Sequence, residues 1–337
     1  MASHRAHTAH YADPKENARF PWKAVGWWLT GALAIGAVVV VVMHFTELSR
    51  IAEGLKHMET QWLLPALVFQ FFSYVFAAGV WLLVARRSGA RVDILSLAVL
   101  SIGQVFARQA VPSGGVSGSL LVLKGFRNRG VPKDVGAACL MVNMISFYVG
   151  YAAAVAAGMA AFMEKHALSH RLETVGFAVL ALAVAAPLAL GSLWRKQSAH
   201  KPPRIVERLK WLREIYATLQ QAREDMTRSP LLIAAAAALQ FGVFVVDAAT
   251  LFVVLLAFGH APPVTLVFAA HVLANAVGTV APIPLGLGAY EGACIFLLHR
   301  IGAPVETALT AVLIFRGLTF WLPMLPGFFI TRRELGK

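Results

Sequence analysis

Long apolar blocks separated by short polar segments organise this chain. An apolar stretch of about 20 residues, at roughly 1.5 Å per residue, crosses a bilayer core. The first block exceeds a signal-peptide core of about 7–15 residues, so we interpret it as a retained signal anchor. Six blocks are long enough to be full membrane spans: 22–45, 62–85, 133–162, 174–193, 230–258 and about 304–330.

Two shorter blocks each run into a segment rich in proline and glycine. Ile94–Val111 leads into Pro112-Ser-Gly-Gly-Val-Ser-Gly118, and Val264–Ala281 leads into Pro282-Ile-Pro-Leu-Gly-Leu-Gly288. Proline and glycine break helices and free backbone polar groups that lipid cannot satisfy. Such tips are therefore expected to be buried in protein or to line a polar cavity. The pattern predicts two re-entrant helical hairpins, at about 94–130 and 264–301.

The composition supports an all-α, polytopic integral membrane protein. The chain is 58% hydrophobic and 14% charged, with a mean hydropathy of +0.67, whereas soluble domains carry about 25% charged residues. The formal charge of +13 does not indicate nucleic-acid binding, because the basic residues cluster in the gaps between apolar blocks. Cys139 and Cys294 lie inside apolar blocks, which argues against a disulfide framework or thiol-rich metal site. We predict no metal or cofactor.

The charge distribution predicts the topology. Residues 1–22 form a basic tail, the 46–61 connector has two basic and three acidic residues, and 194–229 has nine basic and four acidic residues. Basic segments favour the cytoplasm, and only re-entrant hairpins keep both the tail and the linker there. We expect a cell (inner) membrane protein with cytoplasmic tails at 1–22 and 331–337, membrane halves at 23–193 and 230–330, and a cytoplasmic linker at 194–229.

The basic linker also has an apolar helical periodicity. Its apolar residues recur at one face: Ile205, Leu209, Leu212, Tyr216, Leu219 and Met226. This spacing predicts an amphipathic helix that lies on the membrane surface beside anionic lipid. The alternative is a solvated linker that packs on the protein's own loops.

An internal repeat relates the two halves. Four residue pairs match at one offset of 170: Gln70 with Gln240, Gly89 with Gly259, Pro112 with Pro282, and Gly118 with Gly288. With the topology above, the hairpins open to opposite sides of the membrane. Inverted repeats with broken helices that meet near the midplane are typical of transporters.

A few ionisable residues fall inside the apolar blocks. They are Arg108, Asp247, Glu291 and Arg316, and His271 and Asn275 accompany them as polar residues. A charge at mid-bilayer costs at least about 2.5–3.5 kcal/mol and is usually paired or functional. For the four charges the alternative is a buried ion pair or carbonyl clamp that fixes helix packing. His271 and Asn275 are typical of interhelical hydrogen bonding.

Enzyme motifs are missing from the sequence. It contains no G-x-S-x-G, no H-E-x-x-H and no phosphate-binding glycine loop before a basic helix. We therefore expect no catalytic activity.

Three second-half motifs carry a family resemblance: Pro282–Glu291, Gly302-Ala-Pro304 and Phe315-Arg-Gly-Leu-Thr-Phe-Trp-Leu-Pro323. They resemble the lysylphosphatidylglycerol synthase transmembrane family, and Pro112–Gly118 with Gly130-Val-Pro132 is similar to its earlier motif. In two-part members, such as the multiple peptide resistance factor, the membrane region is a lipid flippase and a separate soluble domain is the synthase. We do not expect a synthase domain in these 337 residues. Val142-Asn143 stands where many members have Glu-Arg.

The leading hypothesis is a flippase or transporter for a phosphate-bearing phospholipid or lipid-linked intermediate. Arg108 or Arg316 would bind the phosphate, and Glu291 would balance the arginine or contact a cationic headgroup. The alternatives are an ion-coupled small-solute transporter, with a proton on Asp247 or Glu291, and a non-transporting subunit that anchors a separate lipid-modifying enzyme. The predicted substrate residues are Arg108, Ser113, Gly114, Gly115, Gly118, Pro282, Gly286, Gly288, Glu291 and Arg316.

Overall fold

The computed structural model describes parts of the chain between residues 56 and 336. Described are residues 58–110, 116–164, 224–281 and 286–336, with isolated positions at 56, 174, 176–178, 181 and 185. The predicted span at 22–45, nearly all of the span at 174–193, and most of the linker at 194–229 lie outside these residues. So do the hairpin-tip residues Ser113, Gly114, Gly115 and Pro282.

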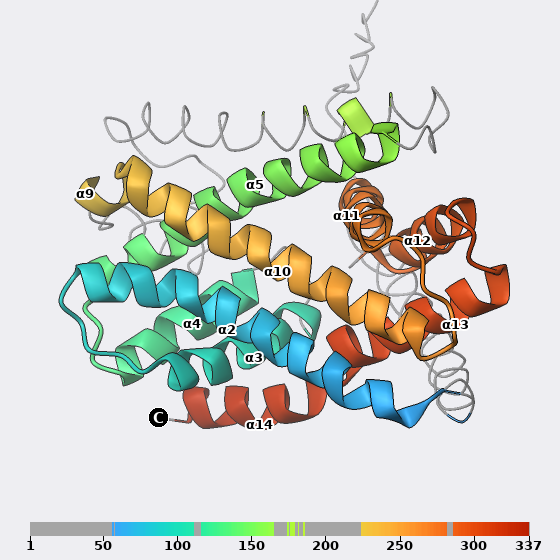
Figure 1. The fold of residues 1–337 in the computed structure, drawn as a ribbon. Helices are drawn as coiled ribbons and strands as arrows, with labels where there is room; N and C mark the ends of the chain where they lie inside the picture. The colour runs from blue at the N-terminus through green and yellow to red at the C-terminus, as the bar shows by residue number, and fades with distance from the viewer. Residues whose placement is uncertain are drawn as a thin grey trace, which may run out of the picture. The chain divides into compact units, whose positions relative to one another are not determined.

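The described residues fold into helices and turns, without a strand (Figure 1). In chain order the elements are η1 (Thr60–Trp62), α2 (Leu63–Arg87), α3 (Ile94–Ala110), α4 (Val116–Asn128), α5 (Lys133–Glu164), α9 (Glu224–Thr227), α10 (Pro230–Leu256), α11 (Val264–Val280), α12 (Ala289–Arg300), α13 (Val305–Arg316), the π-helical turn η3 (Gly317–Trp321) and α14 (Met324–Leu335).

Four helical stretches are long and apolar enough to cross a membrane: Thr60–Arg87, Lys133–Glu164, Pro230–Leu256 and Val305–Leu335. They coincide with four of the predicted spans, so the helical membrane class predicted from the sequence is confirmed. The last stretch differs in detail, because it contains a π-helical turn and continues through Leu335 instead of ending near residue 330.

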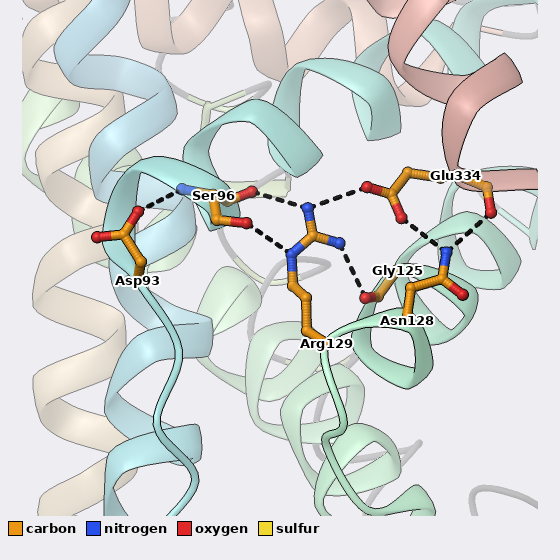
Figure 2. Close-up of polar contacts among 6 residues, drawn as sticks. All are labelled: Asp93, Ser96, Gly125, Asn128, Arg129 and Glu334. Carbon is orange, nitrogen blue, oxygen red and sulfur yellow. Dashed lines mark hydrogen bonds and ion pairs between the residues drawn. The ribbon is translucent and has the colours of Figure 1, made fainter. Parts of the chain in front are cut away.

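The first hairpin consists of α3 and α4, which pack against each other. Small residues allow the close approach: a Cβ added at Gly125 would lie 2.5 Å from Cδ1 of Leu100, on the facing helix. The base of this hairpin also contacts α14. Asn128, at the end of α4, donates to the Glu334 backbone oxygen at 2.9 Å (Figure 2).

The second hairpin consists of α11 and α12. Gly286, with φ of +65°, approaches the end of α11 so closely that an added Cβ would lie 2.7 Å from the Gly278 carbonyl oxygen. Both the left-handed conformation and the contact require glycine at this turn.

The two hairpins open at opposite ends of the long helices. The Glu59 amide, just before α2, donates to the Ala257 carbonyl at 3.1 Å, so α2 starts where α10 ends. The short connection after α2 leads into α3 at one end, and the short connection after α10 leads into α11 at the other (Figure 1). This antiparallel arrangement agrees with the predicted inverted repeat.

The buried apolar residues form two clusters that follow the two halves. One cluster joins α5 and α10 to the second hairpin and α13, and includes Leu251, Val267 and Leu298. The other joins α2, the first hairpin and α5, and includes Trp81, Leu97 and Phe126. Large apolar side chains are also exposed outside these cores, among them Leu64, Leu231 and Phe329. Such outward apolar surface suits contact with lipid.

Candidate functional site

Glu291 is held at the start of α12 by a glycine turn. Gly288 precedes the helix with φ of +82°, and its backbone N–H donates to Oε2 of Glu291 at 2.6 Å. Glu291 is the third helical residue, where an acidic side chain caps free N–H groups and faces the positive end of the helix dipole. The glycine-rich tip and the carboxylate therefore form one local unit.

Arg316 completes an ion pair with Glu291. Arg316 is the last residue of α13, immediately before the π-helical turn. Its Nε donates to Oε1 of Glu291 at 2.5 Å, and the two side chains are only 17% and 9% exposed. Both oxygens of the carboxylate are thus engaged, one by the helix cap and one by the arginine.

The Arg316 guanidinium is bounded by two aromatic rings. Its central carbon lies 5.1 Å from the ring centroids of Tyr290 and of Phe320, which is cation–π distance. One terminal nitrogen, Nη2, is buried and has no hydrogen-bond partner among the residues that the structure describes. A buried donor without an acceptor is costly, so the arrangement favours an anionic oxygen beside Nη2.

Tyr290 links this pair to α11. The Tyr290 hydroxyl lies 3.0 Å from Nδ1 of His271, and the Tyr290 ring stacks on Phe315 with centroids 6.2 Å apart. His271 is buried, its Nε2 has no hydrogen-bond partner among the described residues, and its ring meets Phe315 edge-on. His271 thus makes the interhelical contact predicted for it and leaves one unsatisfied nitrogen.

Asp247 lies on α10 beside α2. Oδ1 of Asp247 is buried and has no hydrogen-bond partner in the described part of the chain. No ion pair between described residues joins Asp247 to Glu291 or Arg316.

Arg108 occupies the equivalent region of the first hairpin but is differently placed. It is exposed, in the last turn of α3, and its aliphatic stem covers Gly118, where an added Cβ would lie 2.6 Å from Cγ of Arg108. Arg108 makes no ion pair or hydrogen bond with any residue that the structure describes. No such contact in the described part of the chain joins it to the Glu291–Arg316 pair either.

The repeat explains why the ion pair occurs in one half only. Ser146-Phe147 aligns with Thr319-Phe320, so Asn143 is the counterpart of Arg316. Oδ1 of Asn143 accepts from Nε2 of Gln240 at 3.0 Å, and Val142 is fully buried in the first-half core. The first half thus uses this position to join α5 to α10 through neutral groups.

Sequence reasoning missed the two aromatic neighbours of the pair. Tyr290 directly precedes Glu291, and Phe320 follows Arg316 by four residues, which is one helical turn. An aromatic residue one turn from an intramembrane arginine is a usable signal. Among the described residues no group of three or more His, Cys, Asp or Glu side chains could hold a metal, and Cys139 and Cys294 are buried and unbonded to each other.

The fold and site define a polytopic helical membrane protein with two opposed helical hairpins and an ion pair at the start of α12. The family model described as Lysylphosphatidylglycerol synthase TM region matches residues 28–327. The chain therefore belongs to this family, as its motifs predicted, and membership fits a membrane, lipid-related role. No curated protein matches the chain.

Proposed function

We propose that the protein moves a phosphate-bearing lipid across the membrane, with Arg316 as the group that binds the phosphate. The observation that carries this proposal is the buried Nη2 of Arg316, which has no acceptor among the described residues although Nε of the same guanidinium donates to Glu291. A guanidinium matches phosphate oxygens with parallel donors, and an ammonium does not.

The neighbours of Arg316 suit a transient anion. Glu291 keeps the arginine paired when no lipid is bound, and the rings of Tyr290 and Phe320 fix the plane of the guanidinium. A phosphate oxygen would satisfy Nη2 and share the positive charge with Glu291. Because Nη2 is buried, a lipid headgroup reaches it only after neighbouring groups move.

Charge at the helix ends supports the orientation of this transporter. Exposed basic residues gather where α2, α4 and α14 end: Arg86, Arg87, Arg91, Arg127, Arg332 and Arg333. The opposite end exposes both signs, with Lys56 and Arg300 beside Glu59 and Glu306. By the positive-inside rule, we place the basic end and the C-terminus in the cytoplasm, so the second hairpin enters from outside.

The test is lipid translocation by the purified full chain in sealed vesicles. Fluorescent phosphatidylglycerol is compared with a fluorescent neutral glycolipid that lacks phosphate, and inner-leaflet label is scored by its protection from a membrane-impermeant quencher. We expect protein-dependent movement of the phosphate lipid alone. Movement of both at equal rates, or of neither, would contradict the proposal; inactivity toward both is the outcome expected of a non-transporting subunit.

The critical variant is Arg316→Lys. It keeps the charge and the ion pair with Glu291 but loses the planar donors and the ring stacking. Loss of one charge-assisted hydrogen bond of about 1.5–3 kcal/mol predicts a translocation rate lower by about tenfold or more. Arg332→Lys, at an exposed position in the last turn of α14, is the matched control and should keep the wild-type rate.

Asp247 is the observation that favours a second candidate, an ion-coupled transporter. Its buried oxygen, without a partner among the described residues, could carry a proton inside an apolar helix. Coupled transport requires an ion gradient, whereas the leading proposal predicts lipid movement in vesicles without one. Asp247→Asn separates the two, because it should abolish gradient-driven uptake and leave gradient-free lipid movement intact.

A further inference from the structure

A cavity with both polar and apolar walls lies at the base of the first hairpin, and Arg316 does not line it. It occupies about 330 Å³ between the start of α3, the end of α4 and the last turn of α14. Figure 2 shows the polar groups on its wall, which come from all three helices. This cavity was not predicted from the sequence, because Glu334 falls in the segment expected to be a tail.

Arg129 forms a rigid part of the wall. Its Nε donates to Oγ of Ser96 at 2.8 Å, its Nη1 to the Gly125 carbonyl at 2.8 Å, and its Nη2 lies 3.0 Å from Oε1 of Glu334. Asn128 donates to the other oxygen of Glu334 at 2.9 Å. The buried carboxylate is therefore neutralised, and the geometry of the wall is fixed before any ligand binds.

Arg333 supplies an uncompensated charge. It lines the same cavity, is exposed, and makes no ion pair or hydrogen bond with any residue that the structure describes. With Arg129 offset by Glu334, the cavity keeps a net positive charge on a donor that is free to bind an anion.

Part of the cavity wall is apolar and exposed. Leu95 and Val99 both line the cavity, and they are 57% and 45% exposed on the outer face of α3. A water-soluble anion gains nothing from these side chains, whereas a lipid presents its glycerol backbone and acyl chains beside its phosphate. Basic pockets between membrane helices, close to the headgroup level, are typical sites for anionic lipid.

We propose that this cavity binds the headgroup of an anionic phospholipid as a resident lipid, separate from any lipid that is transported. The Arg333 guanidinium contacts the phosphate, and the acyl chains lie over Leu95 and Val99. The bound lipid bridges α14 to the first hairpin and so stabilises their contact. This site does not depend on the transport proposal, because it shares no residue with the Arg316 site.

The test measures thermal unfolding of the full chain in neutral detergent during titration with lipid. A ligand that binds the folded state raises Tm in a saturable manner. We expect phosphatidylglycerol to raise Tm, and phosphatidylcholine, glycerol phosphate and inorganic phosphate to have little effect at equal concentration. No rise with phosphatidylglycerol would overturn the proposal, and an equal rise with glycerol phosphate or phosphate would reassign the cavity to a small anion.

Two adjacent arginines provide the matched variants. Arg333→Gln should raise the phosphatidylglycerol concentration at half-effect at least fivefold, while Arg332→Gln, whose side chain does not line the cavity, should change it less than twofold. Leu95→Gln removes apolar contact without altering charge and should also weaken the effect. An equal change for the two arginine variants would mean general electrostatic attraction of the lipid instead of binding at this cavity. An unchanged response in Leu95→Gln would contradict the proposed contact between the acyl chains and Leu95.

Discussion

Breaking the Glu291–Arg316 pair from each side should give different stability losses. Glu291→Gln keeps an oxygen that accepts the Gly288 N–H, but it leaves the charge of Arg316 without its carboxylate partner. Losing one partner of a buried pair costs about 3–5 kcal/mol. Arg316 is partly exposed and keeps its two ring contacts, each about 0.5–1 kcal/mol. We therefore expect a loss near the lower end, about 3 kcal/mol.

Arg316→Gln should be milder. The remaining carboxylate still accepts the Gly288 N–H and faces the positive end of α12, which stabilises it by up to about 1 kcal/mol. The expected loss is about 2 kcal/mol. In the double variant no charge is left unpaired. Its loss in free energy of unfolding should therefore be about 1–3 kcal/mol smaller than the sum of the losses of the single variants.

Unfolding by denaturant, followed by tryptophan fluorescence, measures these differences, and vesicle translocation measures function in the same four proteins. Glu306→Gln, at an exposed position on α13, controls for the loss of a carboxylate. The decisive result is a double variant that regains stability but remains inactive. Stability losses that add within about 0.5 kcal/mol would refute the coupling. Translocation that returns together with stability would reduce the pair to a structural role.

Two further predictions test the packing and the topology. Gly150→Ala should destabilise the protein by about 1–3 kcal/mol in the same unfolding assay, because the new Cβ would lie 2.7 Å from the Ala237 backbone oxygen on α10. The control Gly292→Ala, whose new Cβ has nothing within 4 Å, should be neutral or stabilise the protein by up to about 1 kcal/mol. Equal effects of the two substitutions would contradict the close crossing of α5 and α10. Single cysteines at the exposed repeat equivalents Arg91 and Ala261 should react with impermeant reagents only from the cytoplasm and only from outside, respectively, and reaction of both from one side would exclude opposed hairpins.

The helices were predictable because their signals are local. Apolar length marked α2, α5 and α10, and the Pro-Gly segments marked where each hairpin breaks. The Glu291–Arg316 contact was not predictable, because the residues are 25 positions apart on different helices and their meeting depends on how α13 packs against α12. Glu334 was missed for a related reason. Its partners, Asn128 and Arg129, come from the other half of the chain, about 200 residues away.

The final helical stretch belongs to both halves of the molecule. Its first part, α13, contributes Val312 and Ile314 to the second-half core, whereas α14 packs on the first hairpin, where an added Cβ at Gly327 would lie 3.1 Å from the Ile102 backbone oxygen. The π-helical turn between these parts follows Arg316 directly. π-helical turns are wider than α-helical ones and often mark functional positions. A shift of the first hairpin would therefore move α14 and, through it, the turn that orients Arg316.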